Sequence, residues 1–158
     1  MDWTGWAVFG LVATTGLTAV MITAQLAGLS RLDLPLMLGT AVTADPDRAR
    51  VAGFALHLAF GQVFGLFYAA GFAALDQATW WLGLAFGAVH GIVALTVFVP
   101  LLPGIHPRMA SERSGPADHA VLEPPGLLAL AYGSRTPAVA LVAHLAYGAV
   151  LGLFLGPG

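Results

Sequence analysis

Apolar residues fill four long stretches of the chain, and none of these stretches contains aspartate, glutamate, lysine or arginine. They are residues 3–30, 51–75, 77–107 and 136–158. A helix needs about 20 predominantly apolar residues to cross the ~30 Å hydrocarbon core of a bilayer. The pattern therefore predicts an all-α integral membrane protein with four transmembrane helices, at residues 5–29, 51–75, 79–102 and 137–155. We expect the first helix to be retained, because Asp2 stands where a signal peptide would carry basic residues.

The chain contains an internal repeat. Residues 57–71 read HLAFGQVFGLFYAAG, and residues 144–158, 87 positions later, read HLAYGAVLGLFLGPG, with nine identities in fifteen positions. The repeat predicts a tandem duplication of a two-helix hairpin, comprising residues 1–75 and 76–158. Its second and fourth spans run in the same direction, so the two halves are related by an axis along the membrane normal.

A short apolar segment precedes the second span, and a similar one precedes the fourth. These segments read LDLPLMLG (32–39) and LEPPGLLALAYG (122–133). Both are too short to span a membrane, and each is predicted to be an interfacial or re-entrant helix on the cytoplasmic side. Polar linkers at 43–50 and 133–136 connect them to the spans, and residues 107–120 are predicted to form a polar loop.

Charged and aromatic residues orient the four spans. All arginines fall in the two loops on one side of the predicted bundle, at positions 31, 48, 50, 108, 113 and 135. All tryptophans fall at the opposite helix ends, at positions 3, 6, 80 and 81. Basic loops stay cytoplasmic and tryptophans concentrate at membrane interfaces. The pattern predicts a multi-pass protein of the bacterial inner membrane, with arginine-bearing loops inside and both termini outside.

Composition excludes several kinds of chemistry. Charged residues make up only 9% of the chain, against about 25% in soluble domains. Cysteine is absent, which excludes disulfides, thiolate metal sites and iron–sulfur clusters. Lysine is absent too, so no Schiff base forms. No hydrolase or nucleotide-binding motif is present, and the few dispersed basic residues do not indicate nucleic-acid binding. An enzyme is not predicted.

Histidines within the spans are the strongest candidates for chemistry. His57 and His144 occupy equivalent positions of the repeat, in the second and fourth spans. These spans lie diagonally in an up-and-down bundle, so inward-facing imidazoles would meet on the pseudo-twofold axis. There they could share a metal or ligate a haem iron from opposite faces. His90, in the third span, is predicted to lie deeper, either as an auxiliary ligand or as a hydrogen-bonding partner of the first span. Structural hydrogen bonding is the alternative for the pair as well.

Glycines follow each histidine of the pair at helical spacing. Gly61 and Gly65 share one helix face with His57, and Gly148 and Gly152 share one with His144. Glycine lowers the stability of a helix interior by about 1 kcal/mol relative to alanine, so the matched glycine stripes indicate a close approach. The approaching group is either a flat tetrapyrrole ring or another helix.

Two acidic residues precede the prolines of the short segments. Asp33 and Glu123 are each predicted to cap a helix N-terminus. If the short segments dip into the membrane, these carboxylates would instead reach the histidines. The combined set of His57, His144, His90, Asp33 and Glu123 would then suit a first-row divalent metal.

The segments LDLPLMLGT, HLAFGQVFGLFYA and GAVHGIVAL together resemble small four-helix bacterial inner-membrane proteins of uncharacterised function. The resemblance implies an inner-membrane location, and it transfers no particular activity to this chain.

Three functions remain open from the sequence. The first is binding of a haem-like tetrapyrrole or a first-row metal through the intramembrane histidines. The second is an accessory or assembly subunit of a larger membrane complex, with the glycines and histidines serving helix packing. The third is a proton- or metal-coupled transporter that works as an oligomer. All three place the protein in contact with lipid, either as a homo-oligomer or within a larger membrane complex.

Overall fold

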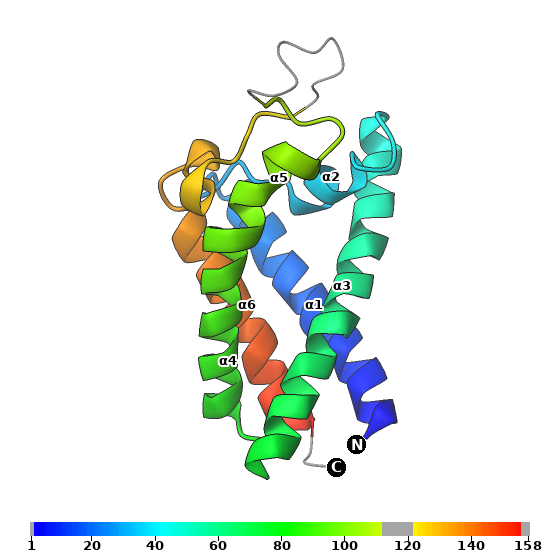
Figure 1. Cartoon of the computed structure of the whole chain (residues 1–158), viewed down its shortest axis with the longest axis vertical. Coiled ribbons are helices and arrows are strands. Elements are labelled where there is room, and N and C mark those ends of the chain that lie inside the picture. Colours follow the sequence, from blue (N-terminus) through cyan, green and yellow to red (C-terminus); the bar gives the residue numbers. More distant parts are fainter. Residues whose placement is uncertain (1, 112–121, 156–158) are drawn as a thin grey trace.

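The computed structural model of the chain describes residues 2–111 and 122–155. Three membrane-length helices are continuous: α1 (Trp3–Leu26), α3 (Pro46–Leu75) and α6 (Thr136–Phe154). The remaining one consists of α4 (Trp80–Val93), a π-helical turn η1 (Ala94–Phe98) and α5 (Val99–Ile105). Each of the four is long and apolar enough to cross a membrane. The predicted all-α fold with four such helices is therefore confirmed (Figure 1).

The second span begins earlier than the sequence pattern predicts. Asp45 accepts a hydrogen bond from the backbone N–H of Arg48 at 2.8 Å, and Pro46 occupies the first turn of α3. A capping aspartate followed by proline is a strong helix start. Most of the predicted polar linker 43–50 therefore belongs to α3, and the prediction of a linker there is wrong.

The helices pack in the order α3, α1, α6, α4. Within this order α1 contacts both α3 and α6, and α4 packs along α6. By contrast, α3 and α4 are joined by a tight turn at Asp76 and diverge from it toward the other end of the bundle (Figure 1). One side of the bundle is thus closed by the packing of α1 on α6, and on the opposite side the α3 and α4 backbones separate with distance from their turn (Figure 1).

Glycines bring α4 and α6 into backbone contact. A Cβ added to Gly83 would overlap the backbone carbonyl of Gly148, and one added to Gly87 would overlap that of His144. In a membrane, small residues of this kind let helices approach closely enough for dispersion forces to hold them together. The α4–α6 pair is therefore the most tightly packed part of the bundle.

The α1–α3 contact uses the equivalent position of the repeat. Gly61 packs against the side chain of Thr14, as Gly148 packs against α4. Nearby, the Trp6 indole donates to the backbone carbonyl of Gln62 at 2.9 Å, and the Gln62 amide donates to the carbonyl of Ala7 at 3.0 Å. Each half of the chain therefore joins its two long helices at the same glycine.

The two short apolar segments fold differently. Asp33 caps α2 (Leu34–Gly39) by accepting from the backbone N–H of Leu36 at 2.9 Å, as predicted. The second segment is not a matching helix. It forms a 3₁₀ segment, η2 (Leu127–Tyr132), interrupted by left-handed residues Leu128 and Ala129.

Prolines explain the difference between the two segments. Pro124 and Pro125 hold the residues before them in extended conformations, and Gly126 then turns with φ of +68°. The helix predicted to follow Glu123 therefore cannot start there. Instead of capping, Glu123 pairs with Arg31 at 3.2 Å.

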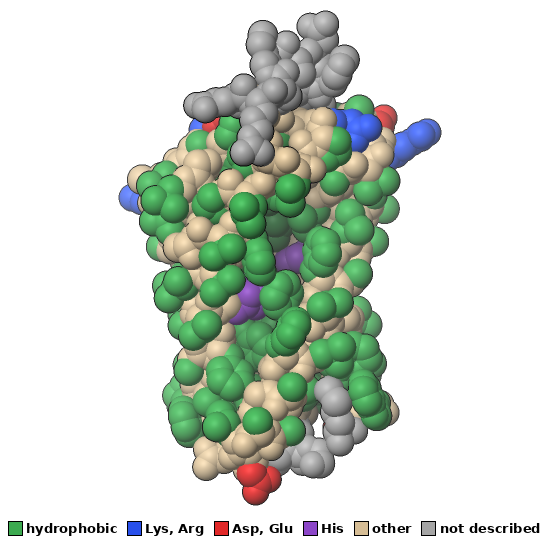
Figure 2. Space-filling model, viewed as in Figure 1, with side chains coloured by type: hydrophobic (Ala, Val, Ile, Leu, Met, Phe, Trp, Pro, Cys, Tyr) green, Lys and Arg blue, Asp and Glu red, His purple; other side chains and the backbone are tan. Residues whose placement is uncertain are grey.

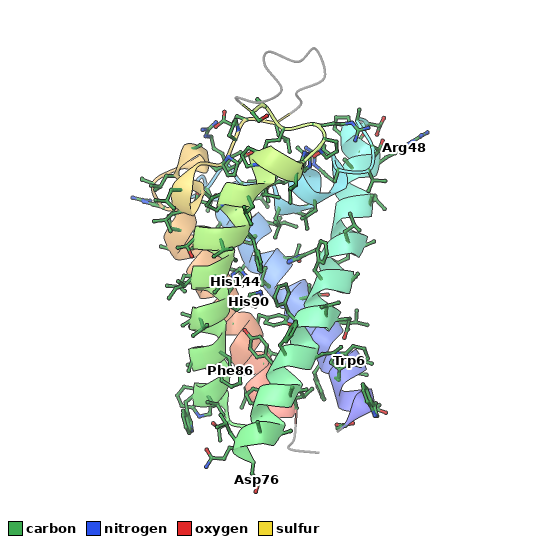
Figure 3. The ribbon with its side chains drawn as sticks, viewed as in Figure 1. Trp6, Arg48, Asp76, Phe86, His90 and His144 are labelled. Carbon is green, nitrogen blue, oxygen red and sulfur yellow. The ribbon has the colours of Figure 1, made fainter. Side chains whose placement is uncertain are left out.

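The charged residues lie at the two ends of the bundle. The described arginines lie at the end formed by α2 and η2, and Asp76 marks the opposite end (Figures 2 and 3). Most of the predicted polar loop 107–120 lies outside the described residues.

The π-helical turn η1 has a local cause. Pro100 has no N–H to donate to the carbonyl of Thr96, and its ring would press on that carbonyl in an α-helix. A wider π turn relieves this conflict. Leu95 and Phe98 of this turn both line a cavity between the helices.

We expect Gly148→Ala to destabilise the bundle by about 1–3 kcal/mol, because the new methyl group overlaps the Gly83 carbonyl. Gly16→Ala is the matched control, since no atom lies within 4 Å of a Cβ at that position. Thermal unfolding in a mild detergent measures both. Equal melting temperatures for the two variants would contradict the close α4–α6 contact.

Candidate functional site

A cavity of about 470 Å³ lies between the helices. Its walls come from every long helix and from α2, and they are formed mostly by leucine, methionine, phenylalanine and valine side chains. No arginine, aspartate or glutamate is among the described lining residues. Three histidines line it: His57 from α3, His90 from α4 and His144 from α6. Figure 2 shows histidine side chains in a hollow on one face of the molecule.

His144 has a fixed tautomer. Its Nδ1 lies 2.7 Å from the backbone carbonyl of Ala140, one turn earlier in α6. A carbonyl only accepts, so Nδ1 carries the proton and donates. In a neutral imidazole the other nitrogen, Nε2, is then an acceptor. This Nε2 has no hydrogen-bond partner within the described part of the chain.

His57 is held in the same way by a threonine. Its Nδ1 lies 2.9 Å from the hydroxyl oxygen of Thr18 on α1. That hydroxyl donates its proton to the backbone carbonyl of Thr14 at 2.8 Å, so its oxygen accepts from His57 Nδ1. The Nε2 of a neutral His57 is thus also an acceptor. Two imidazoles that line the cavity, on helices that lie diagonally, therefore each carry an acceptor Nε2.

His90 is enclosed by aromatic rings. Its ring centroid lies 4.1 Å from that of Phe64 and 5.9 Å from that of Tyr147. Its Nδ1 lies 3.4 Å from the hydroxyl of Tyr68. The ring centroid of His144 is 4.7 Å from that of His90, with the planes nearly perpendicular. Figure 3 shows the two residues side by side in the interior of the bundle.

The structure gathers the three predicted histidines in one cavity but pairs them differently. His57 and His144 were expected to face each other, with His90 deeper and secondary. The two rings in contact are instead His90 and His144. Gly87 and Gly148 set this pairing, because the backbone contact between α4 and α6 brings the adjacent turns of the two helices together. Within the described chain, His57 makes no ring contact with either of the other two.

The predicted carboxylates lie elsewhere. Asp33 caps α2 and pairs with Arg50 at 2.9 Å, and Glu123 pairs with Arg31. Both ion pairs are at the arginine-bearing end of the bundle. In residues 2–111 and 122–155, no group of three or more His, Asp or Glu side chains lies close enough to hold a metal ion.

Of the four predicted site glycines, one lines the cavity. Gly61 borders it while packing on Thr14. Gly65 lies against Trp6 and Tyr147, and Gly148 and Gly152 lie against α4 and the turn before it. The glycine stripes therefore serve contacts between helices of this chain.

Several residues of the site were not predicted from the sequence. The first span was expected to supply a hydrogen-bonding partner to His90, but its Thr18 bonds His57, and His90 contacts Tyr68 and Phe64 of α3. Tyr147 is fully buried and donates to the backbone carbonyl of Gly61 at 2.6 Å, which ties α6 to α3 across the bundle. Tyr147 lies three residues after His144, on the same helix face, and this spacing is the signal that would have found it.

A fourth histidine, His106, lies outside the spans and holds the arginine-bearing end together. Its Nε2 donates to the backbone carbonyl of Met37 at 3.0 Å, and its Nδ1 accepts from the backbone N–H of Arg108 at 3.2 Å. Burial is the main cause that lowers the pKa of His106, and the Arg108 charge adds to it. Protonation of Nδ1 would remove the bond from Arg108.

We expect stability to fall in acid through His106. Because its pKa is lower in the folded than in the unfolded protein, the unfolded chain binds more protons below pH ~6.5. The stabilisation is complete above this pH and is lost progressively as the pH falls below it. His106→Gln, which cannot titrate, should flatten the melting-temperature curve between pH 8 and pH 5. An unchanged slope relative to the parent protein would contradict this role, since the other histidines are common to both.

Comparison of the chain with protein-family models, with curated proteins and with solved structures finds no match.

Proposed function

We propose that this protein is a membrane-embedded binding protein that holds a largely apolar ligand in the three-histidine cavity through imidazole Nε2 atoms. The observation that carries the proposal is the hydrogen bond from His144 Nδ1 to the Ala140 carbonyl. It leaves a lone pair inside an apolar chamber. Histidines that ligate metals are commonly held this way, with the second ring nitrogen donating to a backbone carbonyl.

Polar groups at membrane depth are costly, which favours a functional use of these imidazoles. His57, His90 and His144 each have a hydrogen-bonding partner at Nδ1 within the described chain, and none is found there at Nε2. A purely structural histidine would be expected to use both nitrogens, as His106 does. The cavity volume also falls within the range of ~300–1,000 Å³ typical of small-molecule sites.

Two classes of ligand suit a bare Nε2: a metal centre and a hydrogen-bond donor. For a haem-type iron with opposite axial ligands, the ring centroids would be roughly 6 Å apart, given metal–nitrogen distances of about 2 Å. The His90–His144 separation of 4.7 Å is too short for this. His57 and His144 are therefore the pair for an axial site, whereas His90 and His144 suit adjacent positions on one metal ion.

An accessory role within a larger complex has less support. That role would use the glycine stripes to contact partner helices. Gly65, Gly148 and Gly152 already pack against helices of this chain.

We expect His144→Ala to abolish ligand binding, because it removes the lone pair with the best-defined direction. Absorption spectra and elemental analysis of the purified protein, before and after addition of haemin or Zn²⁺, measure it. Val142→Ala is the matched control, on the same helix with its side chain 55% exposed on the outer surface. Thermal unfolding of both variants separates lost binding from lost folding. Full occupancy of folded His144→Ala would contradict the proposal.

We also propose that the arginine-bearing end faces the bacterial cytoplasm. The described arginines at one end and the tryptophans at the other support this orientation. Because the chain has no cysteine, single cysteines report on topology without background. In intact cells, an impermeant maleimide should label Gln77→Cys and leave Val42→Cys unlabelled until the membrane is opened. The reverse pattern would contradict the orientation.

A further inference from the structure

The cavity opens sideways, at a level where the helices would be surrounded by lipid. Phe60 and Val63 of α3 and Phe98 of η1 line the cavity, and these three residues are 43–51% exposed. We call these three residues the mouth. Figure 2 shows histidine side chains through the hollow on this face. Since α3 and the α4–α5 helix are membrane-length, the mouth opens toward acyl chains.

The cavity opens between α3 and α4. In the sequence repeat this helix pair is the counterpart of α6 and α1, which pack against each other. The opposite seam, between α1 and α6, is sealed by the stacked rings of Phe9 and Phe154, with centroids 4.8 Å apart. Between α3 and α4, aromatic side chains meet near the turn, such as the stacked rings of Phe72 and Phe86. The π-helical turn at the mouth supplies Leu95 and Phe98 to the lining. Such turns are often found at functional sites.

The lining restricts the charge of any ligand. With no arginine among the described lining residues, an anionic group would be buried without a counter-charge. Burial of an unpaired charge is prohibitively unfavourable in an apolar medium. The part of a ligand that lies inside the cavity is therefore uncharged, which disfavours a head group with a free carboxylate.

The imidazoles restrict its hydrogen bonding. His144 and His57 both donate through Nδ1 to the protein, so both present acceptors to the cavity. A carbonyl oxygen offers no proton to an acceptor, whereas a hydroxyl group does. The complementary head group is one that donates.

These observations point to one class of ligand. We propose that the cavity binds an uncharged molecule dissolved in the bilayer, whose hydroxyl or phenol head donates its one proton to Nε2 of His144 and whose apolar tail leaves through the mouth. This inference rests on the proposed function. Of the two classes of ligand named there, it selects a hydrogen-bond donor over a metal centre.

The head group is tested with 4-decylphenol and with its methyl ether, 4-decylanisole, in which a methyl group replaces the proton that would be donated. The protein is labelled with ¹⁵N-histidine and placed in lipid nanodiscs, and its five histidines are assigned with single variants. The phenol should bind about tenfold more tightly than the ether, as one hydrogen bond implies. Its binding should shift the Nε2 resonance of His144 and leave that of His106 unchanged.

Equal affinity for the phenol and the ether would overturn the inference while leaving the cavity as a binding site. Recovery of the protein with bound haem or a stoichiometric metal would also overturn it, and would support the proposed function in its metal form. If neither probe binds and no cofactor is found, both the inference and the proposed function fail.

The lateral opening is tested without any ligand. A phospholipid with a photoreactive diazirine in its acyl chain is incorporated into the nanodiscs, and labelled residues are mapped by mass spectrometry. Leu95, only 6% exposed but part of the cavity lining, should be labelled as readily as lipid-facing Val89. Leu151, fully buried in the helix packing, should not be labelled.

A substitution at the mouth provides the control. Val63→Trp should reduce labelling of Leu95 at least fivefold, while Val89→Trp, on the outer face of α4 and away from the mouth, should not change it. Absence of label at Leu95 in the parent protein would overturn the opening toward lipid. Label at Leu95 that Val63→Trp leaves unchanged would overturn the assignment of the mouth.

Discussion

The backbone contact between α4 and α6 determines the rest of the arrangement. Lipid chains are as apolar as leucine, so helices associate in a membrane mainly where their surfaces approach closely. Gly83 and Gly148 permit that approach, and they fix the rotation and register of the two helices. His90 and His144 each lie within two turns of these glycines. Their ring contact at 4.7 Å is thus a consequence of glycine packing.

The cavity exists because the two sides of the bundle are unequal. Backbone hydrogen bonds are satisfied within each helix, so a helix pair can separate without leaving unpaired backbone groups. Separation of α3 from α4 therefore needs only side chains to fill or border the gap. The rings of Tyr68, Phe72 and Phe86 fill it near the turn, and the mouth borders it further along. Packing of α1 on α6 keeps the opposite side closed.

Much of this architecture is predictable from the sequence, and the exceptions have identifiable causes. Uncharged apolar stretches define the four helices, and Asp33 before Leu34–Pro35 defines the α2 cap. The pairing of His90 with His144 was not predicted, because sequence spacing gives depth along each helix and not the tilt between helices. Nor was the left-handed turn at Leu128, where Pro124 and Pro125 override apolar periodicity. The positions of Asp33 and Glu123 were not predicted either, because they depend on how the two short segments fold.

The difference in burial between Phe60 and Tyr147 bears on how many ligands one chain can bind. They occupy the same position of the repeat, three residues after His57 and His144, yet Phe60 is 49% exposed at the mouth and Tyr147 is buried against the Gly61 carbonyl. The sequence repeat is therefore not matched by a second equivalent mouth. Under the proposed function, each chain takes one ligand, in one orientation. A ligand that is itself twofold-symmetric would lose that symmetry on binding, and its two halves would report different surroundings.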